Sequence, residues 1–276
     1  LRLGRDRFVV SRLRRVVATL IAAVALFASA IAPADAAVPR HRAPRGYVAL
    51  GDSYAAGLGA AAPKDSCGRS SFGYPSVIAK LARLDLTLAA CSGATMADVA
   101  RTQLGQVTDS ADFVTVQAGG NDIGFAPVLA LCAQPASDDA CAAAVAQGRA
   151  YLEGGFGANA TDLFAAVRDR APEATMVVVG YPRLFSGTDC SPLVEFSATE
   201  QKLINRTIDE LNDQLADAAR QVGARFAYAE SAFNSHAWCA RVPWITGPAG
   251  PVAAFHPNVL GQLLGYAPVV GRKLLG

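Results

Sequence analysis

Four positions that lie far apart in the 276-residue sequence carry its candidate chemistry: Ser53, Gly93, Asn121 and His256. Ser53 ends a Gly-Asp-Ser turn, and Gly57 follows closely. Such a turn can place a serine at a helix N-terminus, where backbone N–H groups face an anion. With a base beside it, a serine in that setting becomes a nucleophile, although a serine that only caps a helix is the commoner arrangement.

Gly93 and Asn121 are candidate donors to the negative oxygen that forms when a serine attacks a carbonyl group. Gly93 has no side chain, so its N–H can approach a ligand closely. Asn121 follows two glycines, and its side-chain amide can donate to a developing oxyanion. Each is also an ordinary turn residue, so neither indicates a function alone.

His256 is the candidate base, and it stands at the entry to the last helical segment. The other two histidines are His41, in an N-terminal polar segment, and His236, between two cysteines. A lone histidine is more often structural than catalytic. His256 is favoured because a helix-entry loop is well placed beside the C-terminal edge of a sheet.

Five short apolar runs predict the strands that position these residues. Short continuous apolar runs are typical of strands buried on both faces of a parallel sheet. The first three lead into the segments with Ser53, Gly93 and Asn121, and such sheets bind ligands at the C-terminal ends of their strands. The runs are 47–50, 86–90, 113–116, 175–179 and 225–229.

Helical patterns lie between these runs, at 74–84, 161–171, 197–222 and 257–275. The clearest is 197–222, which starts with a capping-box pattern at Ser197 and Glu200. Alternating strands and helices predict one α/β/α sandwich with a mainly parallel sheet. The strand order does not follow from these patterns.

The N-terminus is typical of an export signal. Residues 1–36 contain six arginines, a nearly apolar stretch over 16–32 and an Ala-x-Ala cleavage site at 34–36. The apolar stretch is almost long enough to span a bilayer, so an uncleaved anchor is the alternative. We expect cleavage, a linker over 37–46 and one catalytic domain over 47–276.

Composition excludes several other classes of protein. Hydrophobic residues make up 52% and charged residues 17% of the chain, which fits neither a disordered nor a fibrous protein. The leader holds six arginines and two aspartates, so the remainder has 19 basic and 21 acidic residues and a net charge of −2. This balance gives no support for nucleic-acid binding.

The six cysteines all follow the leader. An even count in an exported chain indicates disulfides, and six cysteines allow 15 pairings. None has the spacing of a zinc site, and no cofactor is expected. They are Cys67, Cys91, Cys132, Cys141, Cys190 and Cys239.

The four blocks together resemble the SGNH, or GDSL, hydrolase superfamily, most closely its secreted actinobacterial esterases and lipases. The similarity runs from Tyr47 to the C-terminal helix, with the blocks in the usual chain order. It implies a flavodoxin-like three-layer sandwich with five parallel strands in the order 2-1-3-4-5. It also implies hydrolysis of lipid-like carboxylic esters by an exported, monomeric enzyme.

The resemblance assigns a role to each block. Ser53 would be the nucleophile and His256 the base. The N–H groups of Ser53 and Gly93 and the side chain of Asn121 would form the oxyanion hole. The disulfides would pair sequentially, as Cys67–Cys91, Cys132–Cys141 and Cys190–Cys239.

One position departs from the family pattern. Many members carry an aspartate three residues before the histidine, where this chain has Ala253. A Ser–His dyad is therefore expected, with a backbone carbonyl, that of Ala253, orienting the ring. A carboxylate from a distant position, Asp52 or Glu230, is the alternative.

The substrate pocket is less defined by the sequence. The long segments 123–160, 181–196 and 231–255 hold five large apolar side chains that either pack in the core or line an acyl groove. These are Phe125, Leu129, Trp238, Trp244 and Phe255.

The same catalytic blocks fit several reactions. A carbohydrate acetylesterase, a phospholipase and an acyltransferase remain open, because the blocks build the chemistry and not the pocket. A non-enzymatic binding module would be expected to lack Ser53, Asn121 or His256. A dinucleotide site at Gly57 and Gly59 lacks the third glycine of its motif.

Overall fold

Five strands, each rich in Val, Leu or Ala, form one parallel sheet in the order β2-β1-β3-β4-β5. This is the order that the resemblance implied. The edge strand β2 alternates exposed and half-buried residues, whereas the central strands are nearly all buried. The strands are β1 Gly46–Gly51, β2 Asp85–Leu88, β3 Ala111–Gln117, β4 Thr175–Val179 and β5 Arg225–Ala227.

The computed structural model describes residues 44–276 except 62, 135–137, 189, 191–195 and 249–252. The expected signal over 1–36 and most of the linker over 37–46 lie outside the described residues. Among the residues described, no helix is both long and apolar enough to cross a membrane.

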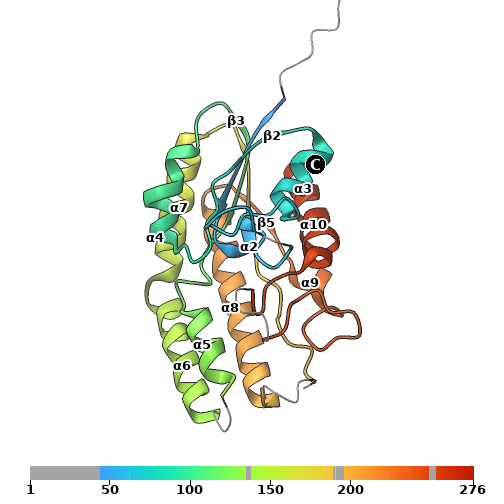
Figure 1. Cartoon of the computed structure of the whole chain (residues 1–276). Coiled ribbons are helices and arrows are strands. Elements are labelled where there is room, and N and C mark those ends of the chain that lie inside the picture. Colours follow the sequence, from blue (N-terminus) through green and yellow to red (C-terminus); the bar gives the residue numbers. More distant parts are fainter. Residues whose placement is uncertain (1–43, 62, 135–137, 189, 191–195, 249–252) are drawn as a thin grey trace, which may run out of the picture. The chain divides into compact units, whose positions relative to one another are not determined.

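Helices cover both faces of the sheet (Figure 1). On one side lie α3 Tyr74–Ala82 and α10 Ala267–Leu275, which contact each other. On the other lie α4 Met96–Asp98, α7 Gly157–Arg170 and α8 Ala198–Gln221. A three-layer α/β/α sandwich results, as expected from the alternating pattern.

The helix α8 begins as its sequence predicts. The Ser197 hydroxyl accepts the N–H of Glu200, and the Glu200 carboxylate accepts the N–H of Ser197. This reciprocal capping box satisfies two backbone donors that a helix start leaves unpaired. The last helical segment begins later than Pro257, because the Asn258 side chain accepts the N–H of Gly261 and supplies the cap.

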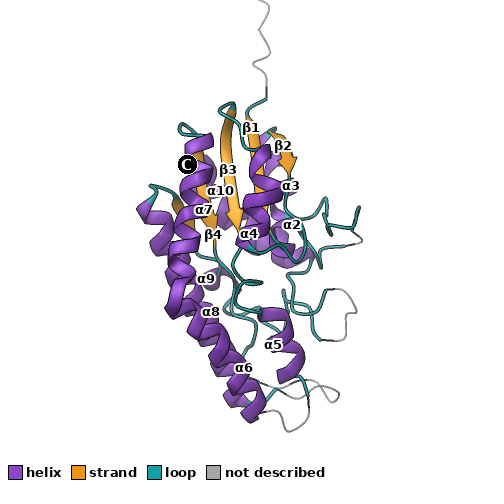
Figure 2. Ribbon diagram, turned by 90° about the vertical axis from the view of Figure 1, so that its left-hand side faces the viewer, coloured by secondary structure: helices purple, strands orange, loops and turns teal. Residues whose placement is uncertain are grey.

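Segment 123–160 folds into helices that the sequence patterns did not predict. Figure 2 shows α5 and α6 beyond the C-terminal ends of the strands, beside the lower part of α8. Their apolar residues do not form one clear stripe, because α5 is apolar on nearly all sides and α6 is largely alanine. The bounds are α5 Phe125–Cys132, α6 Asp138–Tyr151 and η3 Leu152–Phe156.

Candidate active site

Ser53 and His256 meet at the C-terminal end of β1. Ser53 is the first residue of the short helix α2 Ser53–Ala56, and its Oγ lies 2.7 Å from Nε2 of His256. Gly51 makes the tight turn possible: its φ is 137°, and a Cβ there would lie 2.1 Å from the carbonyl oxygen of Gln117. Only glycine tolerates both conditions.

A backbone carbonyl orients the histidine. Nδ1 of His256 lies 2.8 Å from the carbonyl oxygen of Ala254. A carbonyl can only accept, so Nδ1 carries the proton and Nε2 is free to accept the serine proton. Burial lowers the pKa of His256, which favours this neutral form.

The carbonyl that bonds to Nδ1 is that of Ala254 and not the expected one of Ala253, although hydrogen bonding by both carbonyls acts to raise the pKa of the ring. The Ala253 carbonyl accepts the hydroxyl of Thr246 and, at 3.2 Å, the N–H of His256. Neither alternative carboxylate bonds to His256: Asp52 bonds to Tyr54 and Tyr181, and Glu230 bonds to Asn212. Ser53 and His256 therefore form a hydrogen-bonded pair, the expected dyad, in which the acceptor for the histidine ring among the described residues is a backbone carbonyl.

Tyr54, the residue that follows Ser53, holds the loop that carries His256. The hydroxyl of Tyr54 donates to the carbonyl of Phe255 at 2.6 Å, and its ring lies 4.9 Å from that of His256. Phe255 adopts a φ of 58°, a conformation that is unusual for a bulky residue. At Gly59 a Cβ would come within 3.0 Å of Cβ of His256, so the loop packs closely there.

Within the described part of the chain, Asn121 uses one of its two amide hydrogens. Its Nδ2 donates to the carbonyl of Ala94 at 3.0 Å, and an amide group has two hydrogens. The neighbouring Asp122 carboxylate accepts the N–H of Met96, with both oxygens 3.1 Å away. These contacts join the loop after β3 to the loop that contains Gly93.

Gly93 itself is exposed. Its φ is 81°, and the space that a side chain would occupy is open. Whereas Ser53 and Asn121 line the cavity beside the dyad, Gly93 does not line it. The next residue, Ala94, contacts the site, because its carbonyl accepts a hydrogen bond from the side chain of Asn121.

An apolar cavity of about 270 Å³ opens beside the dyad. Of the five large side chains that the sequence singled out, Phe125, Leu129 and Phe255 line this cavity. One wall is α5 and another is the middle of α8. The apolar residues of these walls are Phe125, Ala126, Leu129 and Ala130 on α5, the following Ala133, and Ile208 and Leu211 on α8.

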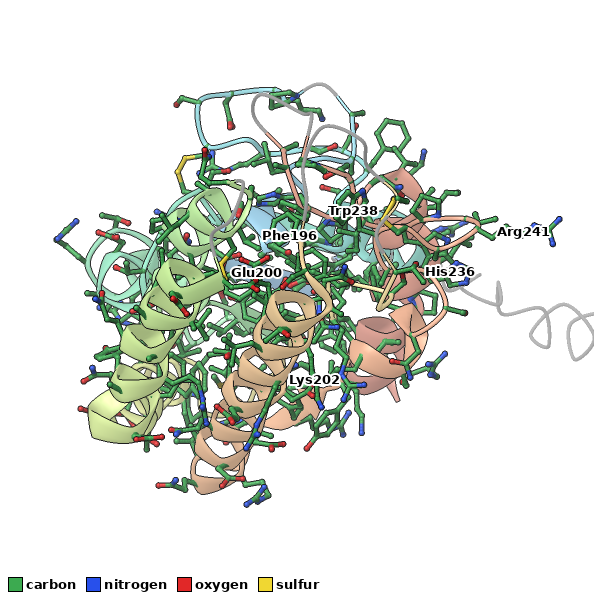
Figure 3. All side chains as sticks on the ribbon, turned by 90° about the horizontal axis from the view of Figure 1, so that it is seen from below. Phe196, Glu200, Lys202, His236, Trp238 and Arg241 are labelled. Carbon is green, nitrogen blue, oxygen red and sulfur yellow. A yellow bond between two sulfur atoms is a disulfide. The ribbon has the colours of Figure 1, made fainter. Side chains whose placement is uncertain are left out.

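Trp238 and Trp244 have packing roles instead. Trp238 contacts the rings of Phe185, Phe196 and Phe255, and Figure 3 shows it near Phe196 in the view from below. Trp244 stacks on His236, with ring centres 3.6 Å apart. Trp238 packs behind Phe255, which lines the cavity. Neither tryptophan is part of the cavity lining.

Two buried glutamines that the sequence analysis missed hold the backbone around Ser53. Gln103 accepts the N–H of Gly51 at 2.8 Å and donates to the carbonyl of Gly51 at 2.9 Å. Gln262 accepts the N–H of Tyr74 and donates to the carbonyl of Tyr54. Both lie in π-helical turns, which are frequent at functional sites. Gln262 stands among apolar residues in the sequence, whereas Gln103 follows Arg101 and Thr102 and carries no such signal.

The three disulfides are Cys67–Cys91, Cys132–Cys141 and Cys190–Cys239, the pairing that the resemblance implied. Cys67–Cys91 supports the Gly93 loop, where Ser92 also bonds to the carbonyl of Cys67.

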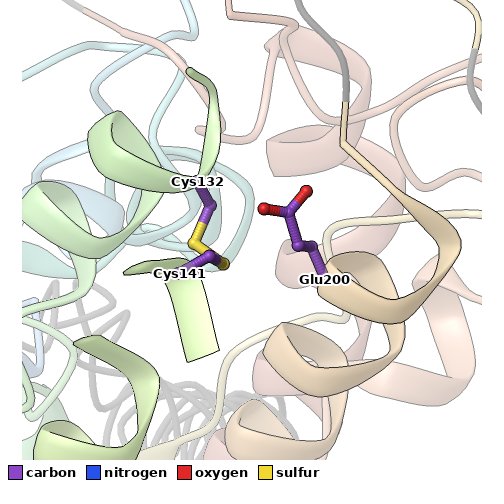
Figure 4. Close-up of side chains that lie close together, drawn as sticks. All are labelled: Cys132, Cys141 and Glu200. Carbon is purple, nitrogen blue, oxygen red and sulfur yellow. A yellow bond between two sulfur atoms is a disulfide. The ribbon is translucent and has the colours of Figure 1, made fainter. Parts of the chain in front are cut away.

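Cys132–Cys141 joins α5, a wall of the cavity, to α6. Figure 4 shows the Glu200 carboxylate facing this disulfide. The sulfur atoms and a Glu200 oxygen lie within 4.8 Å of one another, but sulfurs bonded to each other offer no thiolate to a metal.

A serine paired with a neutral histidine, beside a side-chain amide and an apolar cavity, is the arrangement of serine-dependent acyl hydrolases. Here it stands at the C-terminal edge of a parallel sheet. The chain belongs to the GDSL-like lipase/acylhydrolase family, whose model matches residues 49–264, and it is an ester hydrolase.

Similar proteins agree with this family. A lipase from Streptomyces rimosus is 38% identical over 94% of this chain and 98% of its own length. Lipase 1 from Streptomyces coelicolor is 35% identical over 94% of this chain and 97% of its own length.

Solved structures show the same fold. The extracellular lipase of Streptomyces rimosus has a TM-score of 0.79 and 35% identity, covering 83% of this chain and 99% of its own. Phospholipase A1 from Streptomyces albidoflavus has a TM-score of 0.79 and 33% identity, and the match covers 84% of this chain and 100% of the phospholipase chain. An acetylxylan esterase from Geobacillus stearothermophilus, with a TM-score of 0.55 and 17% identity, shares the fold alone.

Proposed function

We propose that the chain is an exported serine esterase that hydrolyses carboxylic esters of apolar acyl chains through an acyl-enzyme on Ser53. The observation that supports it best is the 2.7 Å contact between Oγ of Ser53 and Nε2 of His256 at the edge of the apolar cavity. A nucleophile, its base and an acyl-binding surface are then together at one site.

The proposed reaction has two halves. His256 takes the proton of Ser53 as Oγ attacks the ester carbonyl, and the imidazolium then protonates the leaving alcohol. Water repeats the sequence on the acyl-enzyme and releases the acid. The Nδ1–H bond to the carbonyl of Ala254 keeps the ring in place throughout and favours its positive form.

The negative oxygen of each tetrahedral intermediate would bind to three donors. These are the N–H groups of Ser53 and Gly93 and the second amide hydrogen of Asn121. Support for Asn121 comes from its place in the cavity lining and from the bond that fixes its other hydrogen to Ala94.

The size and lining of the cavity favour a medium-length acyl chain. The cavity of about 270 Å³ is lined mainly by apolar side chains and has room for an acyl group larger than acetyl. An acetyl group would leave most of this apolar surface without contact, which argues against a carbohydrate acetylesterase. A phospholipid ester is the second candidate substrate, because a phospholipase A1 is among the similar structures.

The proposal includes export of the protein from the cell. The signal-like sequence over 1–36, the three disulfides and the extracellular lipase of Streptomyces rimosus among the similar proteins support it. Disulfides of this kind persist in oxidising compartments.

Hydrolysis of nitrophenyl esters from acetyl to palmitoyl, by the wild type and Ser53→Ala, tests the proposal. We expect highest kcat/KM with a medium chain and a loss of at least about 10³-fold in the variant. Ser110→Ala, an exposed serine, is the matched control and should keep full activity. Full activity in Ser53→Ala would overturn the nucleophile, and an acetyl optimum would overturn the substrate class.

A further inference from the structure

A buried carboxyl group and a buried phenol, those of Asp52 and Tyr181, are part of the cavity lining beside the nucleophile, and the reaction steps above do not use them. Asp52 is 2% exposed and Tyr181 is 6% exposed. The hydroxyl of Tyr181 donates to Oδ2 of Asp52 at 2.6 Å, while Oδ1 accepts the N–H of Tyr54 at 2.9 Å. Asp52 therefore uses both oxygens as acceptors.

The same hydroxyl also reaches the oxyanion side of the site. It accepts the N–H of Gly120 at 3.3 Å. Gly120 directly precedes Asn121, and Asp52 directly precedes Ser53. The Tyr181 hydroxyl thus joins the turn after β1 to the turn after β3. In each turn, the residue it contacts directly precedes a proposed site residue.

Tyr181 is itself held in a fixed place. The carboxamide of Asn212, on α8, accepts the N–H of Tyr181 and donates to its carbonyl, both at 2.8 Å. The ring packs edge-on against Tyr54, with centres 5.2 Å apart. Because backbone and ring are both fixed, the hydroxyl is a rigid link between the two turns.

Helix capping alone does not explain the carboxyl group. Serine, threonine or asparagine caps a helix as well as aspartate, with no charge to bury. Burial raises the pKa of Asp52 to about 7, so the ionised form is costly at neutral pH. An asparagine would supply one acceptor instead of two, and its NH₂ group would reverse the bond to Tyr181.

We propose that Tyr181, held by the Asp52 carboxyl, is a positioning residue that sets the distance between the Ser53 nucleophile and the Asn121 oxyanion donor. The inference rests on the proposed function, because it needs both groups to act in the same reaction. Tyr181 acts through the two turns and not on the reacting atoms.

The variant Tyr181→Phe tests the link, since it keeps the ring and removes the hydroxyl. We expect kcat on a short-chain nitrophenyl ester to fall about 10- to 100-fold, because small misplacements of reacting groups cost rates of this size. KM should change less than twofold. Tyr228→Phe, at an exposed tyrosine, is the matched control and should leave kcat and KM unchanged.

A double-mutant cycle separates positioning from general loosening of the fold. If Tyr181 acts through the Asn121 turn, Tyr181→Phe should cost less than twofold in an Asn121→Ala background. Full additivity, or an unchanged kcat in Tyr181→Phe alone, would overturn the inference. Failure of the proposed function would appear differently, as activity that survives Ser53→Ala.

Asp52→Asn gives a second test that does not depend on the stability of Tyr181→Phe. Around Asp52 lie Tyr54, Tyr74, Tyr181, Tyr266 and the Asp122 carboxylate. Because the pKa of Asp52 is raised in the folded protein, the folded protein loses stability as pH rises towards 7 and this carboxyl group ionises. An asparagine cannot ionise, so Asp52→Asn should raise Tm at pH 8. We expect higher Tm with kcat reduced at least fivefold; higher Tm with unchanged kcat would overturn the inference.

Discussion

Among the described residues, no carboxylate bonds to His256, the proposed base. The carbonyl of Ala254 accepts the Nδ1–H bond and so orients the His256 ring. A carbonyl lacks the full negative charge with which a carboxylate would strongly raise the pKa of the imidazole. Burial dominates and lowers that pKa. The neutral base therefore persists to lower pH than for an ordinary histidine.

The acid side of the kcat/KM profile tests this. Protonated His256 cannot accept the serine proton, so activity should fall as pH drops, with a midpoint below the ordinary histidine value of about 6.5. Asp52 also has a pKa near this range, so Asp52→Asn is the control and should retain the same acid limb. A midpoint at 7 or above would contradict the assignment.

Asn121 is expected to act through its second amide hydrogen. Asn121→Ala should lower kcat about 10²- to 10³-fold, as losing one oxyanion donor does, with Tm changed little. Steady-state kinetics and thermal unfolding measure the two effects. Asn159→Ala, at an exposed asparagine that bonds to Tyr151, is the comparison variant. An unchanged kcat in Asn121→Ala would remove this residue from the site.

At the scale of elements, α5 is expected to govern which acyl chains the site binds, because four of its residues line the cavity. The sheet and its turns assemble the chemistry, but α5 forms one wall of the cavity and is joined to α6 by Cys132–Cys141. Figure 2 places this helix beyond the strand ends, where it faces α8 across the cavity that both helices line. Changes on α5 should therefore alter substrate choice more than catalysis.

Ala130→Phe tests the role of α5. Ala130 lines the cavity and is exposed, so a larger side chain can be added without overpacking the core. Losing room for two methylenes, at about 0.8 kcal/mol each, should lower the decanoyl-to-acetyl activity ratio by about tenfold. Leu131→Phe, on the same helix but outside the cavity lining, is the control. An unchanged chain-length profile in Ala130→Phe would place the acyl chain elsewhere.

Across the whole molecule, export and disulfide formation belong together. Two of the three disulfides join loops and Cys132–Cys141 joins α5 to α6, and disulfides persist in oxidising compartments. The signal-like segment over 1–36 lies outside the described residues and stays a prediction. N-terminal sequencing of secreted protein should find a start near Ala37, whereas a start before Ala34 would contradict cleavage at the Ala-x-Ala site.

Local patterns in the sequence were enough to locate the five strands and α8, and they singled out Ser53 and His256, which the structure brings into contact. An apolar run predicts a buried strand whatever its neighbours are, and a Ser197–Glu200 capping box needs only residues within one turn. The strand order and the disulfide pairing came from the family resemblance, because neither can be read from spacing.

Only the tertiary structure decided which groups touch across the site. The acceptor for His256 is Ala254 and not Ala253, because the unusual φ of Phe255 turns the loop. Asp52 bonds to Tyr181, 129 positions away, and Phe255 lines the cavity while Trp244 does not. Such contacts depend on how distant segments pack against each other in three dimensions, and residue type and periodicity carry no record of that packing.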